Sequence, residues 1–455
     1  MGDDRPGSQA PARVKILLLA AVLIGTPGAV LRSSCVGGCA TAESTPARVP
    51  FCSLPGPLRA KIAAGFRDGR SPDVLAVSGR TAVVGSVPPS GPARPPRVWL
   101  STHRSPNPRV PIVFAGTGIR SDASVPAGAD LRRIAPTVAR ALAFERPFPE
   151  VRSGRPLPGV ARPERPRLVL QVVWKDVGAA DLAADRDAWP TLGRLLTVGA
   201  GTLRGVVGSL PLDPAAALAT IATGGFPAEH GITGTWLRDD RGDVVRAWSP
   251  GAPTSVIGTL ADDLDEAQGQ RPMVGLVGTD PADRGIVGRD WYGRADRDTV
   301  VLVPRGGDQV RATRLVLSDG FGRDRVPDLL AVVASGTVRR LDDQLRRIVR
   351  AAASASNGSL LIVVTATGSP EPASDGPHLA AGDLVRALEA TGVTDGRLVE
   401  AATPGGIFLD RSTLARERIP GSAAADAVFG MEAPDGTSPF ADAFQGFAVS
   451  FGKFC

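Results

Sequence analysis

The chain is poor in the residues that most often mark a metal site or a nucleic-acid interface. Its 455 residues include 3 histidines, 4 cysteines and 1 tyrosine, and aromatic residues make up 5% of the total. A site for two metal ions needs several imidazoles and carboxylates together, so the scarcity of histidine restricts that class. Lys and Arg (52) outnumber Asp and Glu (46) but are scattered along the chain. Nucleic-acid-binding proteins cluster basic residues and interleave aromatic ones, so we predict no nucleic-acid partner.

The N-terminal residues indicate export. Arg13 and Lys15 precede an apolar run at residues 16–25. This length is typical of the hydrophobic core of a signal peptide and short for a membrane span, although an extension to Leu31 leaves an uncleaved anchor open. We therefore predict that residues 1–34 are a signal peptide or an N-terminal membrane anchor. The protein is then secreted or otherwise extracytoplasmic, and membrane-anchored if the segment is retained.

The four cysteines fall near the two ends of the chain. Cys35, Cys39 and Cys52 follow the apolar segment, and Cys455 is the last residue. An even number of cysteines in an exported chain favours disulfides. A metal site is the weaker interpretation, because no second close pair and no nearby histidine accompany Cys35 and Cys39. These observations alone leave the pairing open.

Apolar, β-branched segments alternate with helical stretches over most of the chain. Buried strands are predicted at residues 110–116, 168–174, 273–278, 328–333 and 360–364. Helices are predicted at residues 57–66, 131–144 (capped by Asp130), 190–198, 214–223, 255–267 and 337–353. This alternation predicts an α/β fold, a three-layer sandwich with a mainly parallel central sheet. The Pro- and Arg-rich residues 147–167 indicate an exposed linker.

Two segments of this pattern resemble a known family. "LVLQVVWKDVGAADL", residues 168–182, places Asp176 just after a buried strand, and "LATIATGGFPAEHGITG", residues 218–234, joins a helix to a Pro-x-x-His-Gly-Ile turn. They are similar to the first strand, with its metal-binding Asp, and to the helix behind the nucleophile in the alkaline phosphatase superfamily. The type I phosphodiesterase, nucleotide-pyrophosphatase-like branch is the most similar. The resemblance implies an alkaline-phosphatase-like sandwich.

One part of the resemblance is out of order. "STHRSPNPRVPIVFAGTGI", residues 101–119, resembles the family's C-terminal portion, where a Thr-His-Gly-Ser-Pro-like loop supplies a late metal ligand, here His103. In this chain that portion precedes the first strand. The resemblance therefore implies a circular permutation of one domain, residues 35–455, which is tolerated where termini lie close together. Its parts are the family's C-terminal portion (52–146), a linker (147–167), and the family's N-terminal and central portions (168–454).

At most positions where the family has catalytic or metal-binding residues, this chain has residues that cannot fill those roles. In the family, Asp and His ligands hold two metal ions, usually zinc, and a Ser or Thr between them attacks phosphorus. The nucleophile position falls on Pro214, which has no hydroxyl, and the Asp-His pair of the late strand falls on Ala366 and Thr367. Only Asp176 and His103 match metal ligands. We expect both to be vestigial.

The remaining polar candidates are weaker. Asp213, beside Pro214, is the one residue that could act as a substitute nucleophile, through its carboxylate. His230, in the Pro-x-x-His-Gly-Ile turn, is expected to be structural, as such histidines are in the family. His378 is expected to face solvent. Asp176 and His103 also fit a purely structural interpretation, as a hydrogen-bonded strand-end carboxylate and a loop histidine.

Together, the resemblance and the missing residues predict a secreted or surface-attached pseudoenzyme with a binding or structural role in the cell envelope. It would be catalytically inactive and need no cofactor. The alternative is a divergent metal-dependent phosphodiesterase or phosphatase, a phosphoric-ester hydrolase with zinc or another divalent metal. The sequence identifies no partner, apart from membrane association through the N-terminal segment.

The permutation also implies a pairing of the cysteines. A cut in the family's usual order would leave the segments around Cys52 and Cys455 adjacent in space, so these two are predicted to form a disulfide. Cys35 and Cys39 would form a second bridge. The competing pairing joins Cys39 to Cys455.

Overall fold

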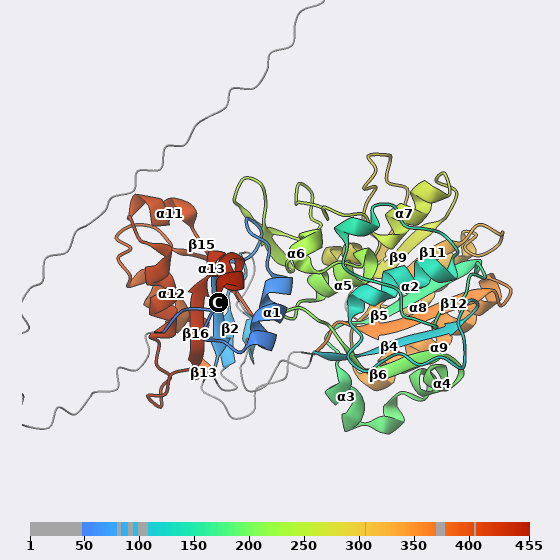
Figure 1. Cartoon of the computed structure of the whole chain (residues 1–455), viewed down its shortest axis with the longest axis horizontal. Coiled ribbons are helices and arrows are strands. Elements are labelled where there is room, and N and C mark those ends of the chain that lie inside the picture. Colours follow the sequence, from blue (N-terminus) through green and yellow to red (C-terminus); the bar gives the residue numbers. More distant parts are fainter. Residues whose placement is uncertain are drawn as a thin grey trace, which may run out of the picture. The chain divides into compact units, whose positions relative to one another are not determined.

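A mixed sheet of seven strands, in the order β10-β9-β11-β5-β12-β4-β6, is the largest element of the fold (Figure 1). The computed structural model describes residues 48–79, 83–89, 94–98, 108–304, 306–369, 378–404 and 406–455. The strands are β4 (Arg109–Gly116), β5 (Leu168–Trp174), β6 (Ala200–Val206), β9 (Val274–Gly278), β10 (Thr299–Leu302), β11 (Asp328–Ala334) and β12 (Leu360–Ala366). The five strands from β10 to β12 are parallel, and β4 and β6 each run antiparallel to the preceding strand of the sheet.

Burial on both faces explains the sequences of the central strands. Every residue of β5, β9, β11 and β12 is buried. Strands covered on both faces are continuous apolar runs instead of alternating ones, which is why these strands could be predicted. The predicted α/β fold with a mainly parallel sheet is confirmed.

Two groups of helices flank this sheet and share its hydrophobic core. The first group comprises α2 (Ile134–Ala141), α5 (Pro214–Thr223) and α7 (Leu260–Ala267), and the second α3 (Ala179–Ala184), α4 (Pro190–Val198), α8 (Gln309–Ser318) and α9 (Val338–Ala355). Short 3-10 turns lie at η1 (Leu131–Arg133), η2 (Pro149–Val151), η3 (Arg186–Ala188) and η4 (Pro281–Ile286). The predicted cap at Asp130 is confirmed, because its side chain accepts a hydrogen bond from the backbone N–H of Arg132.

Further strands form smaller sheets. A four-stranded antiparallel sheet has the order β14-β15-β1-β16, a three-stranded one the order β13-β2-β3, and β7 and β8 form a hairpin. These strands are β1 (Val74–Ser78), β2 (Val83–Ser86), β3 (Arg94–Val98), β7 (Trp236–Arg238), β8 (Val244–Arg246), β13 (His378–Leu379), β14 (Val399–Thr403), β15 (Gly406–Leu409) and β16 (Phe440–Gln445). The helices beside them are α1 (Gly56–Gly65), α6 (Pro227–His230), α10 (Ala381–Glu389), α11 (Arg411–Arg416), α12 (Gly421–Phe429), α13 (Gly446–Phe451) and η5 (Gly452–Phe454). The four-stranded sheet has its own core cluster, which the sequence did not predict.

The segment 147–167, predicted to be an exposed linker, is exposed at 12 of its 21 residues but also packs against the domain. Leu157 and Val160 are fully buried, and only 5% of Arg152 is exposed. The backbone N–H of Leu157 donates to the hydroxyl of Thr137 in α2. The buried positions are a few apolar residues that enter the core and Arg152, which has a carboxylate partner in Asp263.

One consequence of the predicted permutation can be tested in the large sheet. The strand β4 lies in the same sheet as β5, with β12 between them, as predicted. The second consequence, that His103 approaches Asp176, involves residue 103, which lies outside the described residues. The permutation itself stays a prediction.

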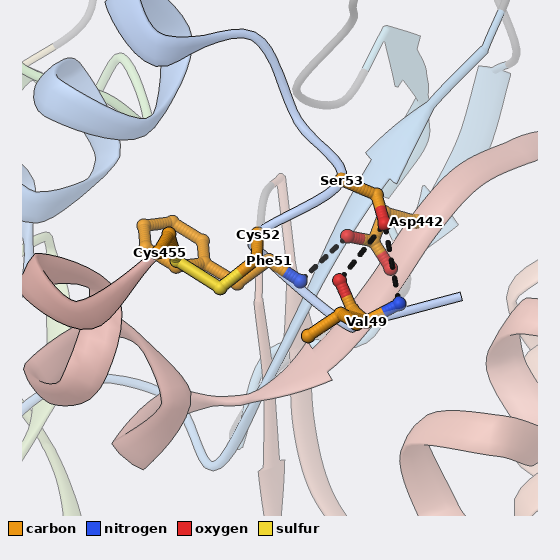
Figure 2. Close-up of a disulfide and its surroundings, with 6 residues drawn as sticks. All are labelled: Val49, Phe51, Cys52, Ser53, Asp442 and Cys455. Atoms are coloured by element: carbon orange, nitrogen blue, oxygen red, sulfur yellow. Dashed lines mark hydrogen bonds between the residues drawn. A yellow bond between two sulfur atoms is a disulfide. The ribbon is translucent and has the colours of Figure 1, made fainter. Parts of the chain in front are cut away.

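The predicted disulfide between Cys52 and Cys455 is confirmed. The two Cα atoms are 5.3 Å apart, although 403 positions separate them in the sequence. Figure 2 shows the bridge beside Phe51, whose backbone N–H donates to Asp442 over 2.7 Å. The second predicted bridge, Cys35–Cys39, lies outside the described residues. In the described part of the chain, no helix has the length and apolar composition needed to cross a membrane.

Candidate functional site

A cleft of about 630 Å³ lies where the parallel strands of the large sheet end. Lys175 and Asp176 follow β5, Thr279 and Asp280 follow β9, and Ser335 follows β11. The carboxyl ends of parallel strands meet at one edge of a sheet, where α/β proteins place their ligands. The remaining walls come from the start of α5, the β7–β8 hairpin and residues of the smaller sheets, including Asp213, Trp236, Arg246, Ser86 and Thr403.

Asp176 lines this cleft, and no metal-ligand cluster includes it among the described residues. Its backbone has a left-handed conformation (φ 56°), and its N–H donates to the hydroxyl of Thr367 over 2.9 Å. Thr367 occupies the position that the resemblance assigns to a ligand, and here it fixes a turn of the backbone. The side chain of Asp176 is exposed.

Next to Asp176, Lys175 supplies one of the positive charges of the site. The ammonium of Lys175 lies 2.8 Å from Asp283 and 3.3 Å from the hydroxyl of Thr279. Only 1% of the Asp283 side chain is exposed, and the carboxylate also accepts backbone N–H groups of Thr279 and Asp280. A buried carboxylate requires such partners. Asp283 is therefore already neutralised by a side chain of the protein.

The position expected to carry the nucleophile is instead the start of a helix. Pro214 is the first residue of α5, where a missing N–H costs nothing. Asp213 caps this helix, accepting the N–H groups of Ala215 (2.8 Å) and Ala216 (3.4 Å) and the hydroxyl of Thr235 (3.1 Å). Burial raises the pKa of Asp213, and hydrogen bonds from Thr235 and from the helix start oppose that rise. This carboxylate therefore has a structural role as a helix cap.

The charge of the cleft is unfavourable for an anionic ligand. Among the residues that the structure describes, the lining holds two cationic side chains, Lys175 and Arg246, and four carboxylates, Asp176, Asp213, Asp280 and Asp283. Both cations are paired, Lys175 with Asp283 and Arg246 with Asp280. With all six groups ionised, the lining has an excess of two negative charges. A phosphate ester would be repelled at every point where it is not held by a cation.

The residues at the cleft do not fit the pair of metal ions that the resemblance implies. Among the residues that the structure describes, no group of three or more His, Cys, Asp or Glu side chains is placed to hold a metal ion. Asp176 is the one predicted ligand that can be located, since His103 lies outside this part of the chain. The carboxylates of Asp280 and Asp283 at this edge of the sheet form ion pairs, and the carboxylate of Asp213 caps a helix.

The side chain of His230 is fully buried. Its Nδ1 accepts the backbone N–H of Ile232 over 3.1 Å, and its Nε2 lies 3.1 Å from the hydroxyl of Thr220. Burial, together with the charges of Arg67 and Arg70, lowers its pKa to about 3. This geometry agrees with the expected structural role. His378 lies in β13, and its side chain is outside the described part of the structure.

The depressed pKa of His230 predicts an acid-dependent loss of stability. In the unfolded chain a histidine takes up a proton below about pH 6.5, whereas the folded protein resists protonation until about pH 3. The unfolded state therefore binds more protons in this window, and stability falls by at most about 1.4 kcal/mol per pH unit as the pH drops.

We expect the parent protein to lose about 2–3 kcal/mol more stability between pH 6.5 and 4.5 than the His230→Gln variant, which has no group to titrate at this position. Urea unfolding at both pH values measures the difference. Shifts from the carboxylates are common to both proteins and cancel. Parallel pH profiles would contradict the assignment of a neutral, buried imidazole.

Comparisons with known proteins give weak structural likenesses. No protein-family model and no curated protein matches the sequence. Among solved structures, a substituted variant of the alkaline phosphatase PafA matches at 15% identity and a TM-score of 0.42, over 58% of this chain and 76% of that one. Wild-type PafA matches with a TM-score of 0.38 at the same identity and coverage. Phosphonoacetate hydrolase from Sinorhizobium meliloti 1021, in complex with phosphonoacetate, matches at 17% identity and a TM-score of 0.35. The match covers 62% of this chain and 81% of that one.

Proposed function

We propose that this chain is an exported, circularly permuted, alkaline-phosphatase-like domain that performs no phosphoryl transfer and acts by binding at the cell envelope. The Lys175–Asp283 ion pair carries the proposal (2.8 Å). It places a side-chain ammonium at the strand ends, where the resemblance would have metal ions between carboxylates.

Attack on phosphorus needs two things that the described residues of the cleft do not provide. The first is a nucleophile whose pKa is lowered by a neighbouring cation or base. The side chain of Pro214 has no nucleophilic atom. The carboxylate of Asp213 caps a helix, and burial raises its pKa. The second is positive charge free to stabilise the transition state. Lys175 and Arg246 are both occupied by carboxylates.

The cleft keeps the features of a binding site. Its volume of about 630 Å³ lies within the range of small-molecule pockets. The Trp236 ring offers an aromatic wall, and Asp176 presents an exposed carboxylate. A neutral polar or cationic ligand suits this lining better than an anion does.

Export is supported by the disulfide. Bonds such as Cys52–Cys455 form and persist in oxidising, extracytoplasmic compartments. The apolar run at residues 16–25 supplies the sequence signal for reaching such a compartment.

The alternative function is a divergent metal-dependent phosphodiesterase or phosphatase. It requires that Asp176 be joined by ligands from residues outside the described part of the chain, of which His103 is the candidate. In that arrangement a divalent metal such as zinc would supply the missing positive charge. Metal content and activity separate the two functions.

We expect purified protein to contain no stoichiometric zinc or manganese by elemental analysis. We also expect Asp176→Ala and the parent to hydrolyse p-nitrophenyl phosphate and bis-p-nitrophenyl phosphate equally slowly, with or without added metal. The exposed Asp343→Ala variant is the matched control. A loss of about a hundredfold or more in the Asp176→Ala variant alone, the scale for removing a group that acts in the transition state, would establish the enzyme.

A further inference from the structure

The C-terminal turns of the chain present three phenylalanines to solvent. The exposed fractions of Phe447, Phe451 and Phe454 are 55%, 60% and 75%. Their spacing of four and three residues places them along one side of a helical segment. The ring centroids are 6.1 Å apart between Phe447 and Phe451 and 6.4 Å apart between Phe451 and Phe454. We call these three residues the aromatic patch.

The opposite side of the same segment is fixed in the core. Val449 is 6% exposed and belongs to a hydrophobic cluster with Phe51 and Phe66. Gly446 fits so tightly that a Cβ would lie 2.7 Å from the Phe66 ring, and at Gly452 a Cβ would lie 2.2 Å from the Phe51 ring. The disulfide to Cys52 ties the end of the segment. The phenylalanines are therefore held outward by a packed backbone.

The described chain begins beside this patch. Cys52, the partner of Cys455, lies four residues after Arg48, whose guanidinium is 2.9 Å from Asp442. Figure 2 shows Val49 near this bridge, and 55% of Val49 is exposed. The 16 residues from 32 to 47 connect Arg48 to the apolar run that ends at Leu31. They can span at most about 55 Å when fully extended.

The size of the patch argues for a lipid surface as its partner. With about 200 Å² per phenylalanine, the exposed parts of the three rings amount to about 400 Å². A stable interface with a second copy buries about 800 Å² on each partner, so the patch is too small for one. Binding at the headgroup–acyl boundary strengthens with the apolar area buried there, and Trp, Phe and Leu are the side chains that helices use for it.

We propose that the aromatic patch inserts into the interfacial region of a lipid bilayer and holds the domain against the membrane. The inference rests on the exported location in the proposed function and is independent of whether the cleft is catalytic. The N-terminal segment would deliver the chain to the membrane, and the patch would set which side of the domain faces the lipid.

Vesicle binding tests this proposal on the compact unit Arg48–Cys455, which contains every described core cluster and the disulfide. We expect this unit to sediment with phosphatidylcholine vesicles. The Phe447→Ser, Phe451→Ser, Phe454→Ser triple variant should bind at least tenfold more weakly. A matched control replaces Val198, Leu302 and Leu315 by Ser, since these apolar residues have similar exposures of 56%, 43% and 60%. It should bind within twofold of the parent.

Three results would overturn the proposal. They are a parent unit that does not bind vesicles, equal loss of binding in both triple variants, and binding that disappears in high salt, which would indicate electrostatic attraction. Analytical ultracentrifugation tests the competing partner, because a dimer that only the Phe variant abolishes would assign the patch to a second copy. Urea unfolding of each variant verifies that the compared proteins are folded.

Discussion

Replacing Asp263 by alanine is expected to lower the free energy of unfolding by about 3–5 kcal/mol. Asp263 is fully buried and binds Arg146 over 2.7 Å and Arg152 over 3.0 Å. It also accepts the hydroxyl of Tyr292 over 2.8 Å. Only 5% of each arginine side chain is exposed, so its loss would leave two buried cations without their carboxylate.

The pKa of Arg146 reflects the unfavourable burial of charge in this network. Burial lowers the pKa of Arg146 to about 10, although Asp263 favours its charged form. Backbone carbonyls at Thr223 and Gly258 accept further N–H groups of this arginine, which keeps the pair in place. Removing one partner of a buried ion pair destabilises a protein more than replacing both partners by apolar residues, because the remaining charge stays buried without a partner.

Urea unfolding of Asp263→Ala measures the effect, and Asp263→Asn serves as a second variant that keeps a hydrogen-bond acceptor. The matched control is Asp343→Ala on α9. Its carboxylate pairs with Arg346 and Arg347, but the three side chains are 47%, 46% and 41% exposed. Exposed pairs contribute less than about 1 kcal/mol. Equal, small losses in Asp263→Ala and Asp343→Ala would contradict a stabilising role for the buried network.

The second large effect is expected from the disulfide. Replacing Cys52 and Cys455 by serine should lower the free energy of unfolding by about 6 kcal/mol in the chain-entropy model, because the bond closes nearly the whole folded chain into one loop. The sequence separation is 403, and the entropy of closing a loop grows with its length. The ends of a chain fray unless they are tied down, so the cluster around Phe51 should also loosen.

Comparison of the oxidised parent, the reduced parent and the double serine variant by urea unfolding measures this contribution. The reduced parent should behave as the variant does. Replacing Cys35 and Cys39 by serine is the control, because it removes the same number of cysteines and keeps the Cys52–Cys455 bridge. A change below about 1 kcal/mol on loss of that bridge would contradict the loop-closure account.

The strands of the large sheet could be predicted because their surroundings dictate their composition. A strand covered on both faces is apolar at nearly every position, which is the pattern of β5, β11 and β12 apart from Gln171, Asp328 and Thr365. Helix starts were also visible locally, at Asp130 and at Pro214. Such signals depend on a few consecutive residues and on the backbone chemistry they allow.

The small antiparallel sheet and the segment 147–167 show where local signals end. Strand β1 lies between β15 and β16, more than 300 residues later, and nothing near residue 74 specifies those partners. In 147–167, prolines and arginines dominate the composition, but Leu157 and Val160 determine where the chain packs. A composition average hides these two residues.

The sequence by itself determined the α/β architecture and the cysteines at both ends, because each depends on the identity of residues at known positions. The assignment of Pro214 to a lost nucleophile position follows from the resemblance and stays a prediction. Tertiary structure alone decided which charges neutralise one another. Lys175 directly precedes Asp176 in the sequence, yet its partner Asp283 is 108 residues away. A buried carboxylate can be satisfied by an ammonium, by backbone N–H groups or by a metal, and its residue type is the same in all three cases. The partner is chosen by packing, which brings the ends of β5 and β9 to one edge of the sheet.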